Sequence, residues 1–366
     1  MRRGYATIPL DVGKCPSWLF ERMKRLARAI IFKIVERYSP EEFLKRISHP
    51  VWFQSFGCAL GFDWNSSGLT TTTLAAIKEG LRGYEKEIGI FVCGGKGKVS
   101  LKTPDEIQKW AWRLGFSEKM TKDLVYASKI SAKVDNTLLQ DGFTLYHHNL
   151  IFTKKGHWSV LQQGMNPEKA LARRYHWLSF VIKDFFEEPH LGIASQIKVS
   201  PLNLVAKESR SLRNFSPEIL KKPEKFLKDF LFIKMKLHDV EYRWHPVLKE
   251  KFDLARLRKT LYLIKEKEPQ SFKEIVEIKG VGPKTIRALC LVGELIYGKK
   301  VSFEDPARYS FCHGGKDGTP YPVDKKTYDE VLEILEEGIK KSNLSITEKE
   351  KTLYHLEREI SKKKEN

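Results

Sequence analysis

The chain has 366 residues, and its 65 Lys and Arg residues outnumber its 46 Asp and Glu residues, which gives a formal net charge of +19. A surface this basic favours a polyanionic partner and makes binding depend on salt, but charge alone does not separate DNA from RNA or from an anionic membrane surface. The apolar content of 41% supports two folded domains and excludes wholesale disorder, and no stretch reaches the ~20 apolar residues that cross a membrane. The five cysteines are scattered and form no C-x-x-C pair, which argues for reduced thiols in the cytoplasm and against a zinc or iron–sulfur centre.

The first 166 residues predict a mixed α/β domain. A helix runs from Pro16 to about Tyr38, where apolar residues recur at helical spacing along one stripe. A capping box from Thr103 to Glu106, with a proline at the first helical position, opens another helix that ends near Leu114. The other expected elements are a strand over 1–10, a helix over 70–84, a short strand over 88–93, and two strands over 143–152 and 158–162 joined by a hairpin loop at 153–157.

From Pro167 onward the pattern becomes helical. Helices are expected at 168–186, 217–236, 252–267, 272–277, 284–297, 326–341 and 347–363. We therefore predict an α+β protein with a mixed α/β domain over 1–166 and an α-helical domain over 167–366, the boundary falling between 165 and 200.

The turn Gly280–Gly282, which reads glycine–valine–glycine, separates two of these helices. Glycines on both sides of an apolar residue permit positive φ and let a phosphate come close to the backbone. Pro283 suits the first position of the next helix, whose free amides and dipole attract an anion. The pattern predicts a helix-hairpin-helix that binds DNA; a helix corner with no ligand is the plain alternative.

The stretch Phe272 to Leu335 resembles the helix-hairpin-helix superfamily of DNA glycosylases, in which a hairpin, a helix and a Gly/Pro-rich loop ending in an aspartate follow one another. The resemblance implies that Lys284, two positions after the second hairpin glycine, attacks the sugar C1′ and forms a Schiff base. It implies that Asp324, at the end of the loop 314–324, is the carboxylate partner, and Asp305 is a competing match for that role. No cofactor is implied.

Candidate DNA contacts combine the hairpin with basic residues elsewhere. Lys284 has a second interpretation, as a phosphate contact only. Lys96 and Lys98 lie in a glycine-rich turn that either cradles a phosphate or is a plain basic turn. Arg173 and Arg174 stand among aromatic residues, which suits backbone contact and base stacking, or else a helix with its aromatic face in the core. The full set is Lys279, Gly280, Val281, Gly282, Lys284, Thr285, Lys96, Lys98, Arg173, Arg174 and Lys316.

A metal-dependent nuclease is the alternative enzyme, in which the N-terminal domain cuts DNA and the hairpin anchors it. Asp63, Asp135 and Asp141 would then hold Mg²⁺ through carboxylate oxygens, whereas turn and capping roles are the plain alternative. His147 and His148 are adjacent, so on a strand they face opposite sides and cannot share one metal ion.

The chain also resembles, from end to end, an archaeal and bacterial family classed as a domain of unknown function. The matching stretches outside the hairpin and the Gly-rich loop are Trp52–Gly68, Gly94–Lys98, Ala132–Tyr146, Gln162–Asn166 and Ala172–Trp177. This resemblance implies no activity. The sequence therefore predicts a DNA-binding protein of repair type, with base excision as the leading hypothesis, the nuclease second, and a non-catalytic DNA-binding protein third.

Overall fold

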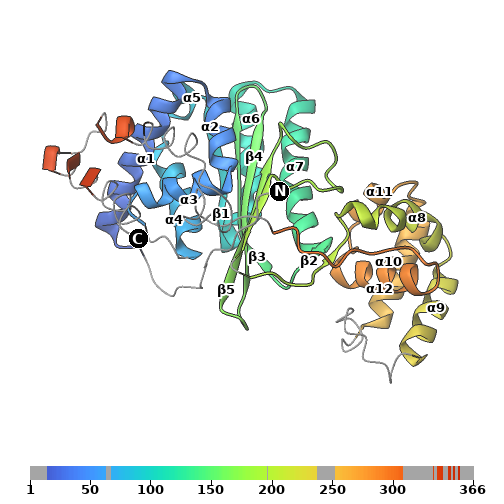
Figure 1. Ribbon diagram of the computed structural model, residues 1–366. Helices are drawn as coiled ribbons and strands as arrows, with labels where there is room; N and C mark the ends of the chain where they lie inside the picture. Colours follow the sequence, from blue (N-terminus) through green and yellow to red (C-terminus); the bar gives the residue numbers. More distant parts are fainter. Residues whose placement is uncertain are drawn as a thin grey trace.

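The computed structural model describes residues 15–62, 67–195, 197–236 and 252–307, with short helical pieces between 333 and 354 (Figure 1). The expected strand over 1–10 and the Gly/Pro-rich loop 314–324 lie outside the described residues, as do most of the two expected C-terminal helices. The described ranges combine helices with an antiparallel sheet, so the α+β class is confirmed. No helix in them is long and apolar enough to cross a membrane.

A five-stranded antiparallel sheet forms the centre of the molecule, in the order β1-β3-β4-β5-β6. Its strands are β1 (Ile90–Lys96), β3 (Thr144–Thr153), β4 (Trp158–Asn166), β5 (Leu171–Leu178) and β6 (Gly192–Ser195). The predicted hairpin between β3 and β4 is confirmed: the amide of Thr153 donates to the carbonyl of His157 over 2.9 Å, and Gly156 has a φ of +81° in the turn. Helices cover both faces of this sheet.

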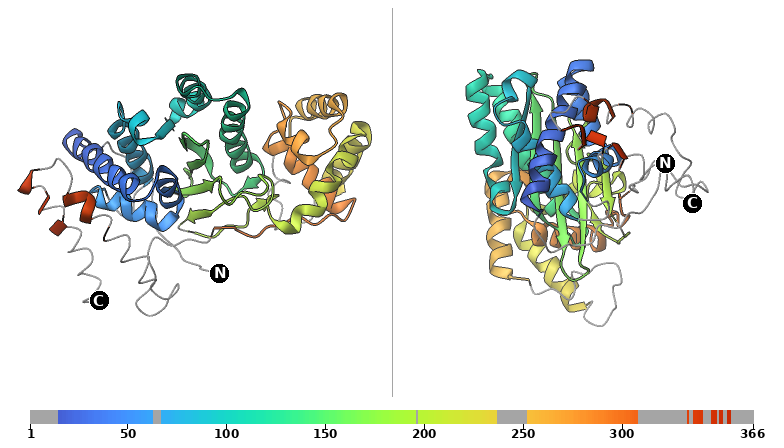
Figure 2. Two further views of the ribbon diagram at one scale, coloured as in Figure 1. Left: turned by 90° about the horizontal axis from the view of Figure 1, so that it is seen from above. Right: turned by 90° about the vertical axis from the view of Figure 1, so that its left-hand side faces the viewer.

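Helices α1 to α4 cover one face of the sheet (Figure 2, left). They are α1 (Ser17–Arg37), α2 (Pro40–Ser48), α3 (Pro50–Ala59) and α4 (Ser67–Gly80), and the short α5 (Glu85–Ile88) follows. The predicted helix from Pro16 to Tyr38 is confirmed as α1, and its apolar stripe is buried, with Met23, Ile30 and Ile34 at its centre. Residues such as Ile151 and Leu161 of the sheet complete this first core.

The opposite face carries η1 (Gly97–Lys102), α6 (Thr103–Leu114) and α7 (Glu118–Thr137). Helix α6 has its predicted bounds, but the capping box is wrong. Because η1 runs directly into α6, Lys102 takes the N-cap position in a helical conformation and no side chain caps it. The carboxylate of Glu106 instead accepts from the amide of Gly94 (2.8 Å) and pairs with Lys78 (2.7 Å), which ties α6 to β1 and α4.

The C-terminal part of the described chain is helical and packs beside the sheet. It contains β7 (Leu202–Asn203), which pairs with β2 (Leu139–Gln140), then η2 (Lys207–Ser209), α8 (Arg210–Leu220), α9 (Pro223–Lys236), α10 (Leu254–Lys267), α11 (Phe272–Glu277) and α12 (Pro283–Leu295). The helices predicted at 252–267, 272–277 and 284–297 are present with ends shifted by at most two residues, whereas the one at 217–236 is split between α8 and α9. We call residues 15–195 the sheet unit and residues 207–295 the helical unit.

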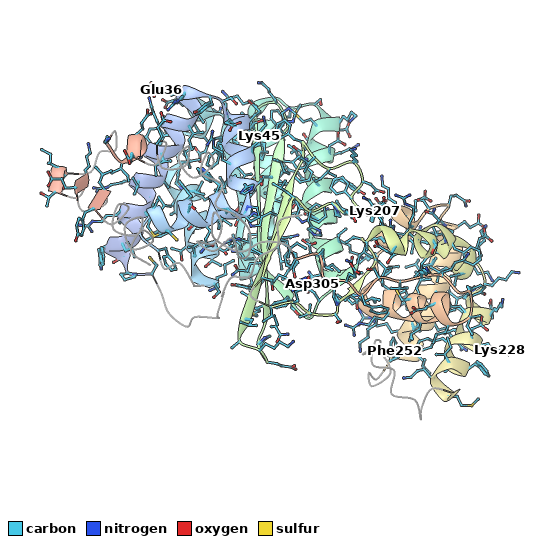
Figure 3. All side chains as sticks on the ribbon, viewed as in Figure 1. Glu36, Lys45, Lys207, Lys228, Phe252 and Asp305 are labelled. Atoms are coloured by element: carbon cyan, nitrogen blue, oxygen red, sulfur yellow. The ribbon has the colours of Figure 1, made fainter. Side chains whose placement is uncertain are left out.

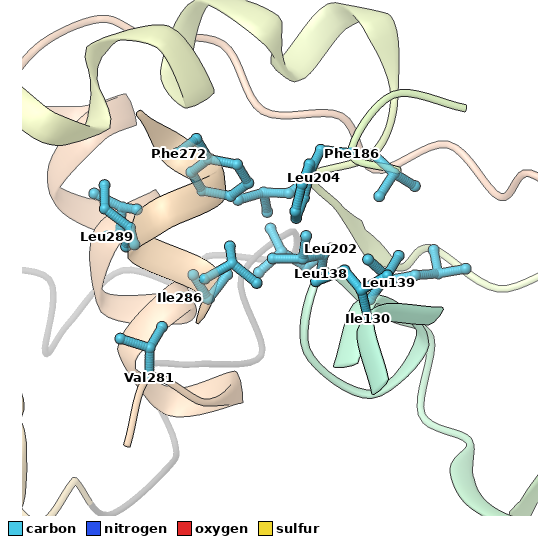
Figure 4. Close-up of a cluster of buried hydrophobic side chains, with 14 of the residues drawn as sticks. Ile130, Leu138, Leu139, Phe186, Leu202, Leu204, Phe272, Val281, Ile286 and Leu289 are labelled. Atoms are coloured by element: carbon cyan, nitrogen blue, oxygen red, sulfur yellow. The ribbon is translucent and has the colours of Figure 1, made fainter. Parts of the chain in front are cut away.

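The predicted helix over 168–186 is wrong, because this segment contains β5. Both faces of β5 are covered, so its polar and apolar residues are buried alike and do not show the two-residue alternation of a half-exposed strand. Strands β5 and β6 pair with the sheet, so residues up to 195 belong with the N-terminal part. A single apolar cluster, which we call the shared core, joins the two units, with Leu138, Leu139 and Leu202 packed between α7 and the helical unit (Figure 4).

Candidate nucleic-acid interface

The corner between α11 and α12, residues 278–284, has an exposed outer side and one apolar anchor. Gly280 has a φ of +103°, a left-handed conformation that glycine adopts at little cost. Val281 is 1% exposed and packs into the shared core (Figure 4), which fixes the corner to the helical unit. Lys279 and Lys284 flank this anchor and are exposed. The corner therefore presents backbone and two cationic side chains outward.

Neither the backbone conformation nor the packing at position 282 requires a glycine. Gly282 is the N-cap residue of α12 with a φ of −139°, an extended conformation open to other residues, and no side chain caps the helix there. A Cβ at this position would meet only the carbonyl oxygen of Gly280, at 4.0 Å. No side chain of residue 282 therefore covers the start of α12, where the first amides of a helix lack an intrahelical partner and the helix dipole favours an anion.

The inner side of the corner is held by the sheet unit. The Nζ of Lys133, on α7, donates to the carbonyl oxygen of Val281 over 2.5 Å. The Nε2 of Gln140, on β2, donates to the carbonyl oxygens of Thr137 (2.7 Å) and Pro283 (3.1 Å), and its Oε1 accepts from the Nε of Arg287. Burial lowers the pKa of Lys133 and that of Arg287. The corner is therefore docked against two elements far away in the sequence.

Lys284 lies in the first turn of α12 with its side chain exposed, and Thr285 next to it is buried. Asp305, the competing carboxylate, does not remain available to a lysine. Its side chain is 3% exposed and pairs with the Nη2 of Arg173 over 2.8 Å, and it accepts from the amides of Val199 (2.8 Å) and Ala307 (2.9 Å). Figure 3 shows Asp305 where the sheet and helical units meet. The other candidate, Asp324, lies outside the described residues.

The prediction that Arg173 and Arg174 contact DNA is wrong. Their side chains are 0% and 1% exposed and lie on opposite faces of β5. Burial alone would lower the pKa of Arg173, but the carboxylates of Asp141 and Asp305 raise it above the ordinary value. Arg174 donates to Thr70 (3.1 Å), Gln54 (3.0 Å) and His176 (2.8 Å), and burial lowers its pKa to about 9. A side chain enclosed in this way cannot reach a phosphate, so these two arginines hold the interior together.

Lys96 and Lys98 are exposed, at the end of β1 and in η1, as a contact with an external phosphate requires. The turn predicted over Gly94–Lys98 is wrong for its first part, because Gly94 lies within β1 and is paired with Asn149 of β3. Gly94 has a φ of +96°, and a Cβ there would lie 2.2 Å from the carbonyl oxygen of His148. The phosphate cradle predicted for this segment stays a prediction. Lys316, the last predicted contact, lies outside the described residues.

The carboxylates predicted for Mg²⁺ are occupied by protein donors. Asp135 accepts from the indole of Trp177 (2.9 Å), the Nε2 of His190 (2.5 Å) and the side-chain Nε2 of Gln162. Asp141 accepts from the hydroxyl of Tyr175 over 2.8 Å and pairs with Arg173 over 2.9 Å. Among the described residues no group of three or more His, Cys, Asp or Glu side chains could hold a metal ion. Asp63 lies outside them, so the nuclease stays an untested alternative.

Sequence reasoning missed the polar networks inside the sheet. His148 bonds to Ser128 (2.9 Å) and Gln162 (2.7 Å) on the α7 side, whereas His147 faces the α1–α4 side. Two adjacent polar residues also occur at Gln162 and Gln163 on β4, directly opposite His148 and His147, and at Arg173 and Arg174 on β5, where only Arg174 pairs with one of them, Gln163. Pairs of adjacent polar residues in otherwise apolar strands were the available signal, because neighbours on a strand face opposite sides.

No curated protein and no solved structure matches the chain. A family model, described as "Protein of unknown function (DUF763)", matches residues 4–323. Because this match covers most of the 366 residues, the chain belongs to that family.

Proposed function

We propose that this protein binds DNA through the corner between α11 and α12, as a protein of repair type. The main observation behind this proposal is Gly282. Neither its backbone conformation nor its packing requires a glycine, yet the glycine leaves the start of α12 without a covering side chain. A phosphate that approaches the helix start closely is a physical reason for such a gap. The exposed ammonium groups of Lys279 and Lys284 and the net charge of +19 favour the same polyanion.

The enzymatic part of the proposal is base excision. Lys284 sits in the first turn of α12, so its amine reaches the DNA that the corner holds, as attack on a sugar C1′ requires. Asp324 is its proposed carboxylate partner, and Asp305 is no longer a candidate because it pairs with Arg173. We place the protein in the cytoplasm on the basis of its cysteines, since the four described ones are free thiols.

Binding is tested with Gly282→Ala and a fluorescent DNA duplex. The added methyl group fits the free protein, so thermal stability should not change, while the affinity should fall about tenfold because the methyl group displaces the phosphate from the amides. Lys284→Ala should lower the salt slope of binding by about one, whereas Lys119→Ala, at the far end of α7, should not. Unchanged affinity of Gly282→Ala would refute the proposed interface.

The chemistry is tested separately by borohydride trapping on duplexes that contain an abasic site. A covalent protein–DNA adduct is expected, because reduction fixes a Schiff base between the lysine amine and the sugar. The adduct should disappear in Lys284→Ala and persist in Lys279→Ala, which keeps the corner but not its other lysine. An adduct that survives in Lys284→Ala would remove this residue as nucleophile without affecting the binding proposal.

A further inference from the structure

We infer that Lys133 and Gln140 are positioning residues for the corner: each holds one carbonyl group, so that the amide which follows faces the DNA. The inference rests on the proposed function and extends it, since it makes binding by the helical unit depend on α7 and β2 of the sheet unit. The two residues lie on the inner side of the corner and do not touch the ligand themselves.

The geometry of the peptide group carries the first step. In a trans peptide the C=O of one residue and the N–H of the next point in opposite directions. Lys133 fixes the carbonyl oxygen of Val281 on the inner side at 2.5 Å, so the N–H of Gly282 points to the outer side. That N–H donates to no acceptor within the described residues, and the bare side of Gly282 lies beside it. An outward amide with open space before it is ready for an external acceptor.

Gln140 does the same for the next fixed peptide. Its Nε2 donates to two carbonyl oxygens, those of Thr137 and Pro283, which only accept, so the orientation of the side-chain amide is determined. The carbonyl of Pro283, the first residue of α12, is thereby tied to β2, and the N–H of Lys284 lies on the opposite side of the same peptide group. Arg287 donates to the other end of the same side chain and links it to the next turn of the helix.

The charge of Lys133 gives a second and independent observation. Its ammonium group is half-buried, its one hydrogen bond goes to a neutral carbonyl, and burial is the cause of its lowered pKa, with no carboxylate among its partners in the described residues. A partly desolvated positive charge without a counterion is unfavourable in the free protein. A phosphate on the far side of the same peptide group offsets this cost, so the charge favours the bound state.

The test measures duplex affinity as a function of salt for Lys133→Met and for the control Lys129→Met. Lys129 is an exposed lysine one turn earlier on the same helix, so both variants lose one charge from α7. We expect Lys133→Met to bind about tenfold more weakly with an unchanged salt slope, because Lys133 contacts no phosphate, and Lys129→Met to bind within about twofold of the parent. Lys133→Arg should restore most of the affinity, since it keeps a cationic donor.

A double-mutant cycle separates positioning from a general loss of structure. If Lys133 acts through the corner, Lys133→Met combined with Gly282→Ala should weaken binding no more than the stronger single variant, because both changes disable the same amide. Gln140→Met provides a second variant should Lys133→Met fail to fold, and it should also bind about tenfold more weakly, because it releases the peptide group before Lys284. Wild-type affinity in Lys133→Met or Gln140→Met, while Gly282→Ala loses binding, would overturn the inference and leave the proposed function standing. Unchanged affinity in Gly282→Ala would remove both.

Discussion

Arg173 carries its positive charge inside the protein, between the carboxylates of Asp141 and Asp305. Its side chain is fully buried, so the cost of removing it from water is met only while both partners and the hydroxyl of Ser195, at 3.1 Å, stay in place. The residue type alone suggests a contact with DNA. Because Arg173 is buried, it instead links β5 to the segment that follows α12. At the scale of single residues, environment determines role.

Replacing Arg173 by Met should therefore lower the free energy of unfolding by about 3–5 kcal/mol, because it leaves two carboxylates without their buried partner. The matched control is Lys119→Met, which breaks the exposed pair with Asp123 at 2.7 Å and should cost less than about 1 kcal/mol. Urea unfolding of both variants measures the difference. Equal losses would show that the buried cluster contributes no more than a surface pair.

His147 should make the protein sensitive to acid. Burial, with the neighbouring His148 as the next cause, lowers the pKa of His147 from 6.5 to about 3. The unfolded chain then binds a proton before the folded one does, so this contribution to stability is complete above about pH 6.5 and decreases as the pH falls toward 3. Between pH 7.5 and pH 5, wild type should lose about 2 kcal/mol more than His147→Leu in urea unfolding. Parallel losses would contradict the prediction.

At the scale of secondary structure, elements with local signals were predictable and elements defined by their neighbours were not. Helix α11 has its predicted bounds because Ser271 caps it and its apolar residues recur at helical spacing. Strand β5 lies where the sequence pattern predicts a helix, because only the layers on both of its faces make its polar residues compatible with a buried strand. The corner follows the same rule: its glycine pattern is local, while Lys133 is 148 positions away from Val281.

The last part of strand β1 offers a test at this scale. Gly94 has a φ of +96°, and a Cβ there would lie 2.2 Å from the carbonyl oxygen of His148 and 2.6 Å from the Oγ1 of Thr103. Gly94→Ala should lower stability by about 2 kcal/mol or more, because backbone strain and collision add and the pairing of β1 with β3 must shift. Gly282→Ala, with open space at its Cβ, is the control and should stay within about 0.5 kcal/mol of the parent. Equal melting temperatures for the two variants would contradict this reading of Gly94.

At the scale of the whole molecule, the sheet and helical units are linked in three physical ways. The apolar cluster runs without a break from α7 to α11 and α12 (Figure 4). Lys133 and Gln140 bond to the corner, and Arg173 binds the segment that returns from α12. Interfaces between independent domains are more polar and allow relative motion, whereas a shared core does not. The orientation of the corner is therefore a property of the whole chain and not of two helices.

The two units should consequently unfold together. Hydrogen exchange followed in increasing denaturant should show the amide of Trp177, in the sheet unit, and that of Leu289, in the helical unit, losing protection at the same concentration. Phe272→Ala, which opens a cavity in the shared core, should lower both transitions by the same amount, about 3–5 kcal/mol. Earlier exchange at Leu289 than at Trp177, or a response to Phe272→Ala confined to the helical unit, would mean that the shared core does not couple them. The corner would then lack the rigid support that holds its amides toward a phosphate.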